Sequence, residues 1–320
     1  MSVKVSVVIA ARHGERFIAE QLRSLFAQQR RPDEILLADD DPAGATAAAA
    51  ESLRGELPPG TKLETAVNSR QFGVDGNMRQ LMFRASGDLI FFCDQDDVWL
   101  PGKIARAVRE FERRPELMLV HSLSEEFSGS GPARRDEALF RAVRSTPKDK
   151  LFAAYLSEKI VASGHDTAIR REFRDLVPEA CPPWLYDGLL AKTAAALDAA
   201  LPVAEVLCRH RLHPGNTANR ELLDNASAFG RASNIARGDG DEIGEFLRGV
   251  ANFERAAEKL PLPPGNREFL ARFAGYLRRR VALRNRPRLL RLFPGGGLWR
   301  DYFTMGRGFR SYLRDALLDR

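Results

Sequence analysis

Residues 88–104 read DLIFFCDQDDVWLPGKI and place three carboxylates directly after an apolar run. A continuous apolar run of this length is typical of a strand buried on both faces of a parallel sheet. Asp94, Asp96 and Asp97 follow this strand, and a Pro-Gly pair then starts the next helix. Three carboxylates so close together repel one another unless a cation or several donors offset their charge. The segment therefore predicts a binding site at the end of a buried strand.

Oxygen ligands of this kind suit Mg²⁺ or Mn²⁺, which keep some water and bind diphosphate oxygens in their remaining positions. A simpler interpretation stays open. Asp97 would then cap the helix that follows it, and the acidic segment would only be solvated.

The same alternation of strand and helix recurs on both sides of this segment. We expect strands at 3–9, 35–38, 62–67, 88–93, 117–122, 167–170 and 203–208. We expect helices at 17–26, 43–53, 76–85, 101–114, 149–157 and 184–199. Such alternation predicts an α/β fold with a mostly parallel central sheet flanked by helices, in which ligands bind at the carboxyl ends of the strands. The Gly-, Ser- and Arg-rich segment 128–148 is predicted to be a loop, and the chain from 221 onward to be helical with breaks at 260–266 and 292–297.

Composition narrows the classes of protein further. The chain has 320 residues, of which 44% are hydrophobic and 29% charged, an ordinary globular balance. Cys93, Cys181 and Cys208 are odd in number and widely spaced, which excludes a disulfide framework or a CxxC metal site. The sequence shows no signal-peptide pattern and no apolar run near the roughly 20 residues that span a bilayer, so we expect a cytoplasmic protein.

The net charge of +6 is unevenly distributed. Residues 272–320 hold 13 arginines, no lysine and three aspartates, a net charge of +10 that leaves about −4 for residues 1–271. A mildly acidic body thus carries a basic tail with interleaved aromatic residues. Such a tail lies naturally on an anionic membrane surface, and it can equally pack on the rest of the chain or on a second subunit as a homodimer. No recognition motif for nucleic acid accompanies it, so we expect no nucleic-acid partner.

Several segments resemble the inverting family 2 glycosyltransferases of the GT-A fold, particularly their bacterial rhamnosyltransferase-like branch. These segments are VSVVIAA, GERFIAEQLRSLFAQ, PDEILLADD, FGVDGNMRQLMFRASGDLIFFCDQDDVWLPGKI, WLYDGLLA and RLHPGNT. The resemblance spans residues 3–217. It implies a catalytic domain at 1–220, with a nucleotide-binding half at 1–122 and an acceptor half at 123–220. A helical, Arg-rich accessory region at 221–320 would follow.

The resemblance also implies a site for a nucleoside-diphosphate sugar with dTDP or UDP, and a divalent metal, Mn²⁺ or Mg²⁺. Donor contacts are expected from residues near the strand ends, namely Ala10, Arg12, Glu15, Asp39, Asp40, Asn77, Asp94, Gln95, Asp96 and Arg211. Metal ligands are expected from Asp94, Asp96 and His213. Asn77 has an alternative interpretation as a helix N-cap.

Inversion needs a base that takes the proton of the acceptor hydroxyl. Asp187 in PWLYDGLLA matches the family's base in spacing and setting, 91 residues after Asp96. An alternative role for Asp187 is to interact only with the dipole of its helix. The acceptor, a glycan or a lipid-linked sugar, is expected to contact Trp99, His165, Trp184 and Tyr186.

The segment CRHRLHPGNTAN resembles the loop that closes over the diphosphate, where Arg211 and His213 would face the phosphates and Asn216 would hold the loop. Two departures from the family pattern affect nucleotide recognition. ARHG stands after the first strand where the family has TYNG, and DDDP stands where it has DDGS. Both departures leave the acidic segment at 94–97 intact. The resemblance therefore predicts the type of reaction more firmly than the nucleobase of the donor.

The resemblance thus predicts an inverting, metal-dependent glycosyltransferase that moves a sugar, rhamnose by the branch resemblance, in bacterial surface polysaccharide synthesis at the inner face of the membrane. Two alternatives stay open. One is an inactive relative that binds a nucleotide or glycan. The other is a sugar-phosphate nucleotidyltransferase, which is disfavoured because AARHGERF lacks the expected Gly-rich phosphate loop with its lysine.

Overall fold

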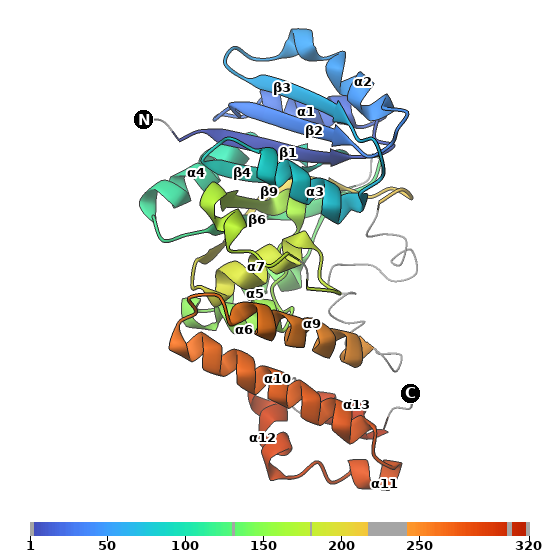
Figure 1. The fold of residues 1–320 in the computed structure, drawn as a ribbon, viewed down its shortest axis with the longest axis vertical. Coiled ribbons are helices and arrows are strands. Elements are labelled where there is room, and N and C mark those ends of the chain that lie inside the picture. Colours follow the sequence, from blue (N-terminus) through green and yellow to red (C-terminus); the bar gives the residue numbers. More distant parts are fainter. Residues whose placement is uncertain (1–2, 130–131, 180, 217–241, 306–308, 318–320) are drawn as a thin grey trace. The chain divides into compact units, whose positions relative to one another are not determined.

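The computed structural model describes residues 3–129, 132–179, 181–216, 242–305 and 309–317 (Figure 1). The chain divides into two compact units. The first comprises Met1–Val177 with Leu185–Asn225, and the second Pro178–Trp184 with Ala226–Arg320. The predicted domain boundary at 220 lies outside the described residues and stays a prediction, as do the two halves of the catalytic domain.

The first unit is built on a sheet of nine strands, with the order β3-β2-β1-β4-β8-β6-β9-β5 and with β7 paired to β6. The strands are β1 Val5–Ala11, β2 Glu34–Asp39, β3 Lys62–Val67, β4 Leu89–Asp94, β5 Val98–Trp99, β6 Leu119–Phe127, β7 Arg134–Arg135, β8 Thr167–Arg170 and β9 Ala200–Arg211. β3, β2, β1 and β4 are parallel to one another, as β6 is to β9. β8 is antiparallel to both of its neighbours. The predicted, mostly parallel α/β sheet is confirmed.

The strand register brings the predicted site residues of three strands together. Ala10 of β1 pairs with Ala38 of β2 on one side and with Asp94 of β4 on the other. Ala11 pairs with Asp39. Because parallel strands end at the same edge of a sheet, the aspartates that end β2 and β4 flank the end of β1.

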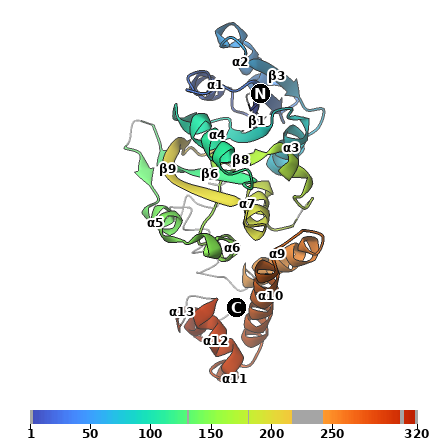
Figure 2. The same cartoon turned by 90° about the vertical axis from the view of Figure 1, so that its left-hand side faces the viewer.

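Helices cover the two faces of this sheet. They are α1 Ile18–Phe26, α2 Ala45–Glu51, α3 Gly73–Arg84, α4 Lys103–Arg113, α5 Glu137–Ser145, α6 Leu151–Leu156 and α7 Tyr186–Ala196. Alternate residues of β1, such as Val5 and Val7, share one core cluster with α1, α2 and α4. Val8 is also fully buried, and the alternation of side chains along a strand directs it to the opposite face. α3 packs on β1 (Figure 2). The apolar run in β1 is therefore explained by burial on both sides.

The predicted loop at 128–148 is wrong in its second half. It contains β7 and α5, and Asp136 caps α5 by accepting hydrogen bonds from Ala138 N and Leu139 N, both 2.9 Å away. Ala142 and Val143 bury the inner face of this helix. The capping aspartate was the available signal, but the Gly- and Arg-rich residues before it concealed the helix.

The second unit contains α9 Glu242–Ala257, α10 Pro264–Arg284, α11 Arg288–Arg291, α12 Gly296–Thr304 and α13 Phe309–Leu317. The predicted helical C-terminal region is confirmed, and the breaks between α9 and α10 and between α11 and α12 fall at the predicted Pro- and Gly-containing segments. None of the described helices is both long and apolar enough to cross a membrane.

A buried ion pair joins two helices of the second unit. Asp315 of α13 is fully buried, and its carboxylate lies 2.6 Å from the guanidinium of Arg280 in α10. The hydroxyl of Tyr302 donates to the same carboxylate at 2.7 Å. Breaking such a pair leaves an uncompensated charge in the interior.

We predict that Asp315→Asn lowers the free energy of unfolding of the second unit by about 3–5 kcal/mol, because Arg280, whose side chain is only 13% exposed, loses its counter-charge. The control is Glu245→Gln, which removes an exposed partner of Arg248 and should leave stability unchanged. Urea unfolding followed by circular dichroism measures both. Equal stability of the two variants would show that the buried pair does not hold these helices together.

Candidate active site

The carboxylates after β4 face imidazoles that come from distant segments of the first unit. Asp96 Oδ2 lies 2.8 Å from His213 Nε2, and Asp94 Oδ2 lies 3.4 Å from His165 Nδ1. His213 follows β9, while His165 lies in a short 3-10 turn before β8. The structure thus brings together four residues that the sequence predicted at the site.

Asp97 is the most deeply buried of the three acids. Its carboxylate accepts a hydrogen bond from Arg211 N at 3.0 Å and lies 2.9 Å from His210 Nδ1 and 3.5 Å from His165 Nδ1. Burial raises the pKa of Asp97, but the charges of His165 and His210 outweigh burial and hold this pKa below its ordinary value. The alternative role as a helix cap is wrong, because α4 is capped at Gly102.

The electrostatic balance at Asp96 is the opposite. Burial and the neighbouring charges of Asp94 and Asp97 raise the pKa of Asp96, and the hydrogen bond with His213 only partly opposes them. Burial and the acidic neighbours of Asp96 therefore disfavour its ionised form. A cation bound there would supply counter-charge.

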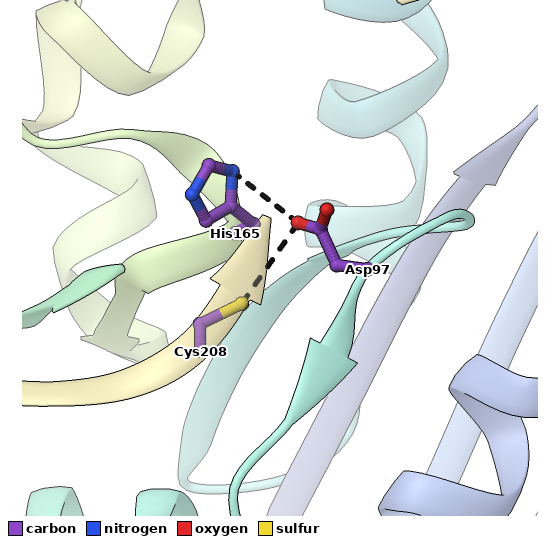
Figure 3. A group of neighbouring side chains, drawn as sticks. All are labelled: Asp97, His165 and Cys208. Atoms are coloured by element: carbon purple, nitrogen blue, oxygen red, sulfur yellow. Dashed lines mark hydrogen bonds and ion pairs between the residues drawn. The ribbon is translucent and has the colours of Figure 1, made fainter. Parts of the chain in front are cut away.

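Two sets of side chains could hold a metal. Asp96 and His213 offer an oxygen and a nitrogen, and both side chains keep some exposure, 10% and 19%. Asp97, His165 and Cys208 form a buried group whose ligand atoms lie within 4.8 Å of one another (Figure 3). Burial raises the pKa of the Cys208 thiol well above its ordinary value. A hard ion such as Mg²⁺ or Mn²⁺ fits Asp96 and His213 better, because thiols suit softer metals.

The other ring nitrogen of His165 contacts a second ion pair, formed by Asp166 and Lys103. The Nε2 atom of His165 lies 3.3 Å from Asp166 Oδ2, and Lys103 Nζ lies 3.4 Å from Asp166 Oδ1. Burial disfavours the charged imidazole, but Asp166 and Asp97 raise the pKa of His165 well above its ordinary value. Sequence reasoning assigned no role to Lys103. Its position in the PGKI end of the acidic segment was the only signal.

The loop after β9 is held by its own residues. Asn216 Nδ2 donates to Arg211 O at 3.0 Å, and Asn216 Oδ1 accepts from His213 N at 2.6 Å. The predicted loop-holding role of Asn216 is confirmed. The guanidinium of Arg211 donates to Asp96 O at 2.9 Å and also pairs with Glu20. Contact between Arg211 and a diphosphate stays a prediction.

Asp39, Asp40 and Asn77, which are expected to contact the nucleotide, are buried. Asp39 accepts hydrogen bonds from the backbone N–H groups of Asp41 and Ala47. The carboxylate of Asp40 accepts three hydrogen bonds, from Asn68 Nδ2, Phe72 N and Gly73 N. The side chain of Asn77 donates one through Nδ2 to Ala38 O. Asp40 and Asn77 therefore shape the turn before α3, and direct contact of Asp39, Asp40 or Asn77 with a nucleotide stays a prediction. The N-cap alternative for Asn77 is wrong, because α3 already begins at Gly73.

The two departures from the family pattern meet in space. His13 Nδ1 lies 3.1 Å from Asp41 Oδ2. The acidic segment is tied to the same loop, because Gln95 accepts a hydrogen bond from Arg12 N at 2.9 Å and donates one to Arg12 O at 2.7 Å. The side chains of Arg12 and Glu15 are exposed. This loop therefore brings its own charges to the end of β1.

Asp187 lies in the first turn of α7. Its Oδ2 atom accepts a hydrogen bond from Gly164 N at 3.2 Å, and its Oδ1 atom accepts one from Gly188 N at 2.7 Å. The neighbouring Tyr186 ring packs on Phe92 of β4. Burial, followed by the charges of Asp94 and Asp187, raises the pKa of Tyr186 well above its ordinary value. Asp187 and the acidic segment therefore both lie near Tyr186. This position fits the role of Asp187 as a catalytic base, and it fits equally its alternative role in the dipole of α7.

The two tryptophans expected at the acceptor lie in different surroundings. Trp99 is only 2% exposed and packs on Phe91 in the core, so the prediction that it contacts an acceptor is wrong. Trp99 lies on the short strand β5, which pairs with β9, and this pairing directs its ring into the core. Trp184 packs on Phe246 and Phe253 within the second unit. Acceptor contacts of Trp184, Tyr186 and His165 stay predictions.

A mostly parallel sheet with carboxylates gathered where its strands end agrees with the GT-A fold that the sequence resemblance implies. A model of the family described as Glycosyl transferase family 2 matches residues 6–176, more than half of the chain. The chain therefore belongs to glycosyl transferase family 2.

Curated relatives are similar in sequence. The uncharacterized glycosyltransferase alr2836 of Nostoc is 25% identical over 67% of this chain and 66% of its own length. The uncharacterized glycosyltransferase YwdF of Bacillus subtilis is 32% identical over 38% of this chain and 42% of its own length. The chain thus spans slightly less than two thirds of the length of the first relative and less than half of the second.

Two solved structures share the fold. Residues 1–349 of TarS from S. aureus, in complex with UDP, are 17% identical with a TM-score of 0.52, covering 86% of this chain and 87% of that one. The mannosyltransferase PcManGT from Pyrobaculum calidifontis, in complex with GDP-Man and Mn²⁺, is 16% identical with a TM-score of 0.58, covering 96% of this chain and 76% of that one. At these identities the likeness concerns the fold alone.

We predict that Gly164→Ala destabilises the first unit by about 1–3 kcal/mol, because the added Cβ would overlap the Tyr186 hydroxyl and lie 2.9 Å from its ring. Tyr186→Phe removes the overlapping oxygen and should partly restore the stability of Gly164→Ala. Urea unfolding of the single and double variants measures this coupling. Strictly additive losses would mean that the two residues do not touch.

Proposed function

We propose that the chain transfers a sugar, with inversion, from a nucleoside diphosphate to an acceptor hydroxyl. The observation that carries the proposal is that one short turn contacts both groups of acids. Gly164 N donates to Asp187 Oδ2 at 3.2 Å, and the next residue, His165, has its Nδ1 atom 3.4 Å from Asp94 Oδ2. Carboxylates on opposite sides of a reacting sugar serve the two needs of this reaction, a neutralised leaving group and a base. The bound UDP of one structural relative and the GDP-Man of another support a nucleotide-sugar donor.

A divalent cation, Mn²⁺ or Mg²⁺, belongs to this proposal. Asp96 and His213 would hold it, with Asp94 beside them, because burial and the acidic neighbours of Asp96 disfavour its ionised form and a cation would offset this. Such an ion supplies Lewis-acid stabilisation of the negative charge that develops on the diphosphate. The Mn²⁺ bound by a structural relative supports this assignment.

This chain's own residues perform the remaining steps. The hydrogen bonds from Gly164 N and Gly188 N orient the Asp187 carboxylate, which takes the proton of the acceptor hydroxyl as that oxygen attacks the sugar. The hydrogen bonds between Gln95 and the backbone of Arg12 hold the acidic segment against the end of β1. Asn216 fixes the loop that carries His213, so that the imidazole stays beside Asp96.

The finer identity of the substrates rests on the sequence resemblance. We propose rhamnose from a dTDP or UDP donor, a glycan or lipid-linked acceptor, and a role in surface polysaccharide synthesis in the cytoplasm. His13 and Asp41 lie close together at the end of β1, where relatives have the TYNG and DDGS segments. We propose that this pair changes how the chain recognises the nucleotide. A screen of nucleotides is therefore needed to identify the nucleobase of the donor.

We predict that Mn²⁺ strengthens binding of a nucleoside diphosphate by tenfold or more, a difference of about 1.4 kcal/mol, and that Asp96→Ala removes this gain. The control is Cys208→Ser, which disables the buried group of Asp97, His165 and Cys208 and should leave the gain intact. Titration calorimetry with dTDP, UDP and GDP, each with and without Mn²⁺, measures both. Loss of the gain in Cys208→Ser alone would place the metal in the buried group.

We predict that Asp187→Asn keeps donor affinity but lowers turnover about 100-fold or more, because the amide cannot take the acceptor proton. Release of the nucleoside diphosphate measures turnover, and calorimetry measures affinity. A matched control is Asp75→Asn, which changes the carboxylate that accepts from Tyr186 N and should leave turnover nearly unchanged. Undiminished turnover in Asp187→Asn would remove Asp187 from the role of base and leave its helix-dipole role.

A further inference from the structure

Exposed apolar side chains are concentrated at one end of the chain. Among the described residues, eleven large hydrophobic side chains are exposed, and seven of them lie between 289 and 317. Phe293 is 74% exposed and Leu289 is 79% exposed. The seven are Leu289, Leu290, Leu292, Phe293, Trp299, Phe303 and Leu317. Apolar side chains gathered in this way mark an interaction surface.

The segment that carries most of them is anchored. The hydroxyl of Tyr312 in α13 donates to Leu292 O at 3.0 Å, and Arg291 Nε donates to Arg286 O at 2.8 Å. Phe293 N also donates to Leu290 O within the turn that follows α11. The second unit therefore holds this turn in place while its apolar side chains face outward. We name the set Leu289, Leu290, Leu292 and Phe293 the α11 surface.

Positive charge flanks the α11 surface in the sequence. Arg286 and Arg300 are exposed on either side of it in the sequence. Residues 272–320 contain only three aspartates. Two of these, Asp301 and Asp315, already pair with Arg279 and Arg280. The segment thus keeps a large excess of arginine charge beside its apolar side chains.

We propose that the α11 surface docks on an anionic phospholipid bilayer, with its leucines and Phe293 inserted at the level of the headgroups and the nearby arginines facing lipid phosphates. Apolar side chains flanked by arginines match the two layers of a membrane surface, hydrocarbon and anionic headgroup. Trp299 on α12, 40% exposed, is the residue type enriched at such interfaces.

Charge favours a membrane over a second copy of this chain. A symmetric dimer through the α11 surface would place the same patch on both sides, and so the arginine-rich segments opposite each other. An anionic lipid surface instead attracts that charge. Nucleic acid also attracts arginines, but it offers no apolar layer for four exposed Leu and Phe side chains. This inference concerns where the enzyme binds and does not depend on the proposed reaction.

The test is co-sedimentation of the full chain with vesicles. We expect binding to vesicles of equimolar phosphatidylcholine and phosphatidylglycerol, weak binding to phosphatidylcholine alone, and loss of binding at high salt. The triple variant Leu289→Ser, Leu290→Ser and Phe293→Ser should bind the anionic vesicles at least about tenfold more weakly. The matched control replaces three exposed apolar residues of the first unit, Val67→Ser, Val74→Ser and Phe83→Ser, and should bind like the unchanged chain.

A second variant keeps the proposal testable if the triple variant does not fold. Arg286→Glu with Arg300→Glu leaves the apolar side chains in place and should also weaken binding to the anionic vesicles. The proposal is overturned if the unchanged chain does not bind anionic vesicles, or if the folded triple variant binds them equally well. It is likewise overturned if size-exclusion chromatography shows a dimer that the triple variant converts to a monomer without any change in lipid binding.

Discussion

The mutual repulsion of Asp94, Asp96 and Asp97 is the constraint on which the first unit depends. Three carboxylates at the end of a buried strand require positive charge nearby. The chain supplies imidazoles from elements far apart in the sequence, of which His165 precedes β8 and His213 follows β9. Offsetting this charge therefore ties the strand that carries the acids to the later strands of the same sheet.

Positive charge is shared unequally between these carboxylates, and this difference decides which of them could bind a cation. The charges of His165 and His210 lower the pKa of Asp97, so this carboxylate has counter-charge within the described residues. Asp96 has one imidazole, and its pKa is raised by burial and by its acidic neighbours. A divalent cation with a diphosphate would complete the balance at Asp96, while the buried pairs at Asp97 keep the segment in its conformation without it.

The fold could be predicted because apolar runs and strand-end acids are local signals, as at 88–97. The partners of the acids could not, because pairing Asp97 with His210 depends on how β9 lies beside β5 and β6. The burial of Trp99 could not be predicted for a related reason. Its side chain turns into the core through the pairing of β5 with β9, which no local pattern indicates. Asp187 was placed correctly at a helix start, but its function depends on a substrate.

We propose that Asp96 and His213 hold a divalent cation beside the acidic segment. Anomalous diffraction at the manganese edge, from crystals grown with Mn²⁺ and the nucleoside diphosphate that binds best, tests it most directly. The account predicts a single strong peak within coordinating distance of Asp96 Oδ2 and His213 Nε2. A peak inside the group of Asp97, His165 and Cys208, or no peak beside Asp96 while the nucleotide is bound, would contradict it.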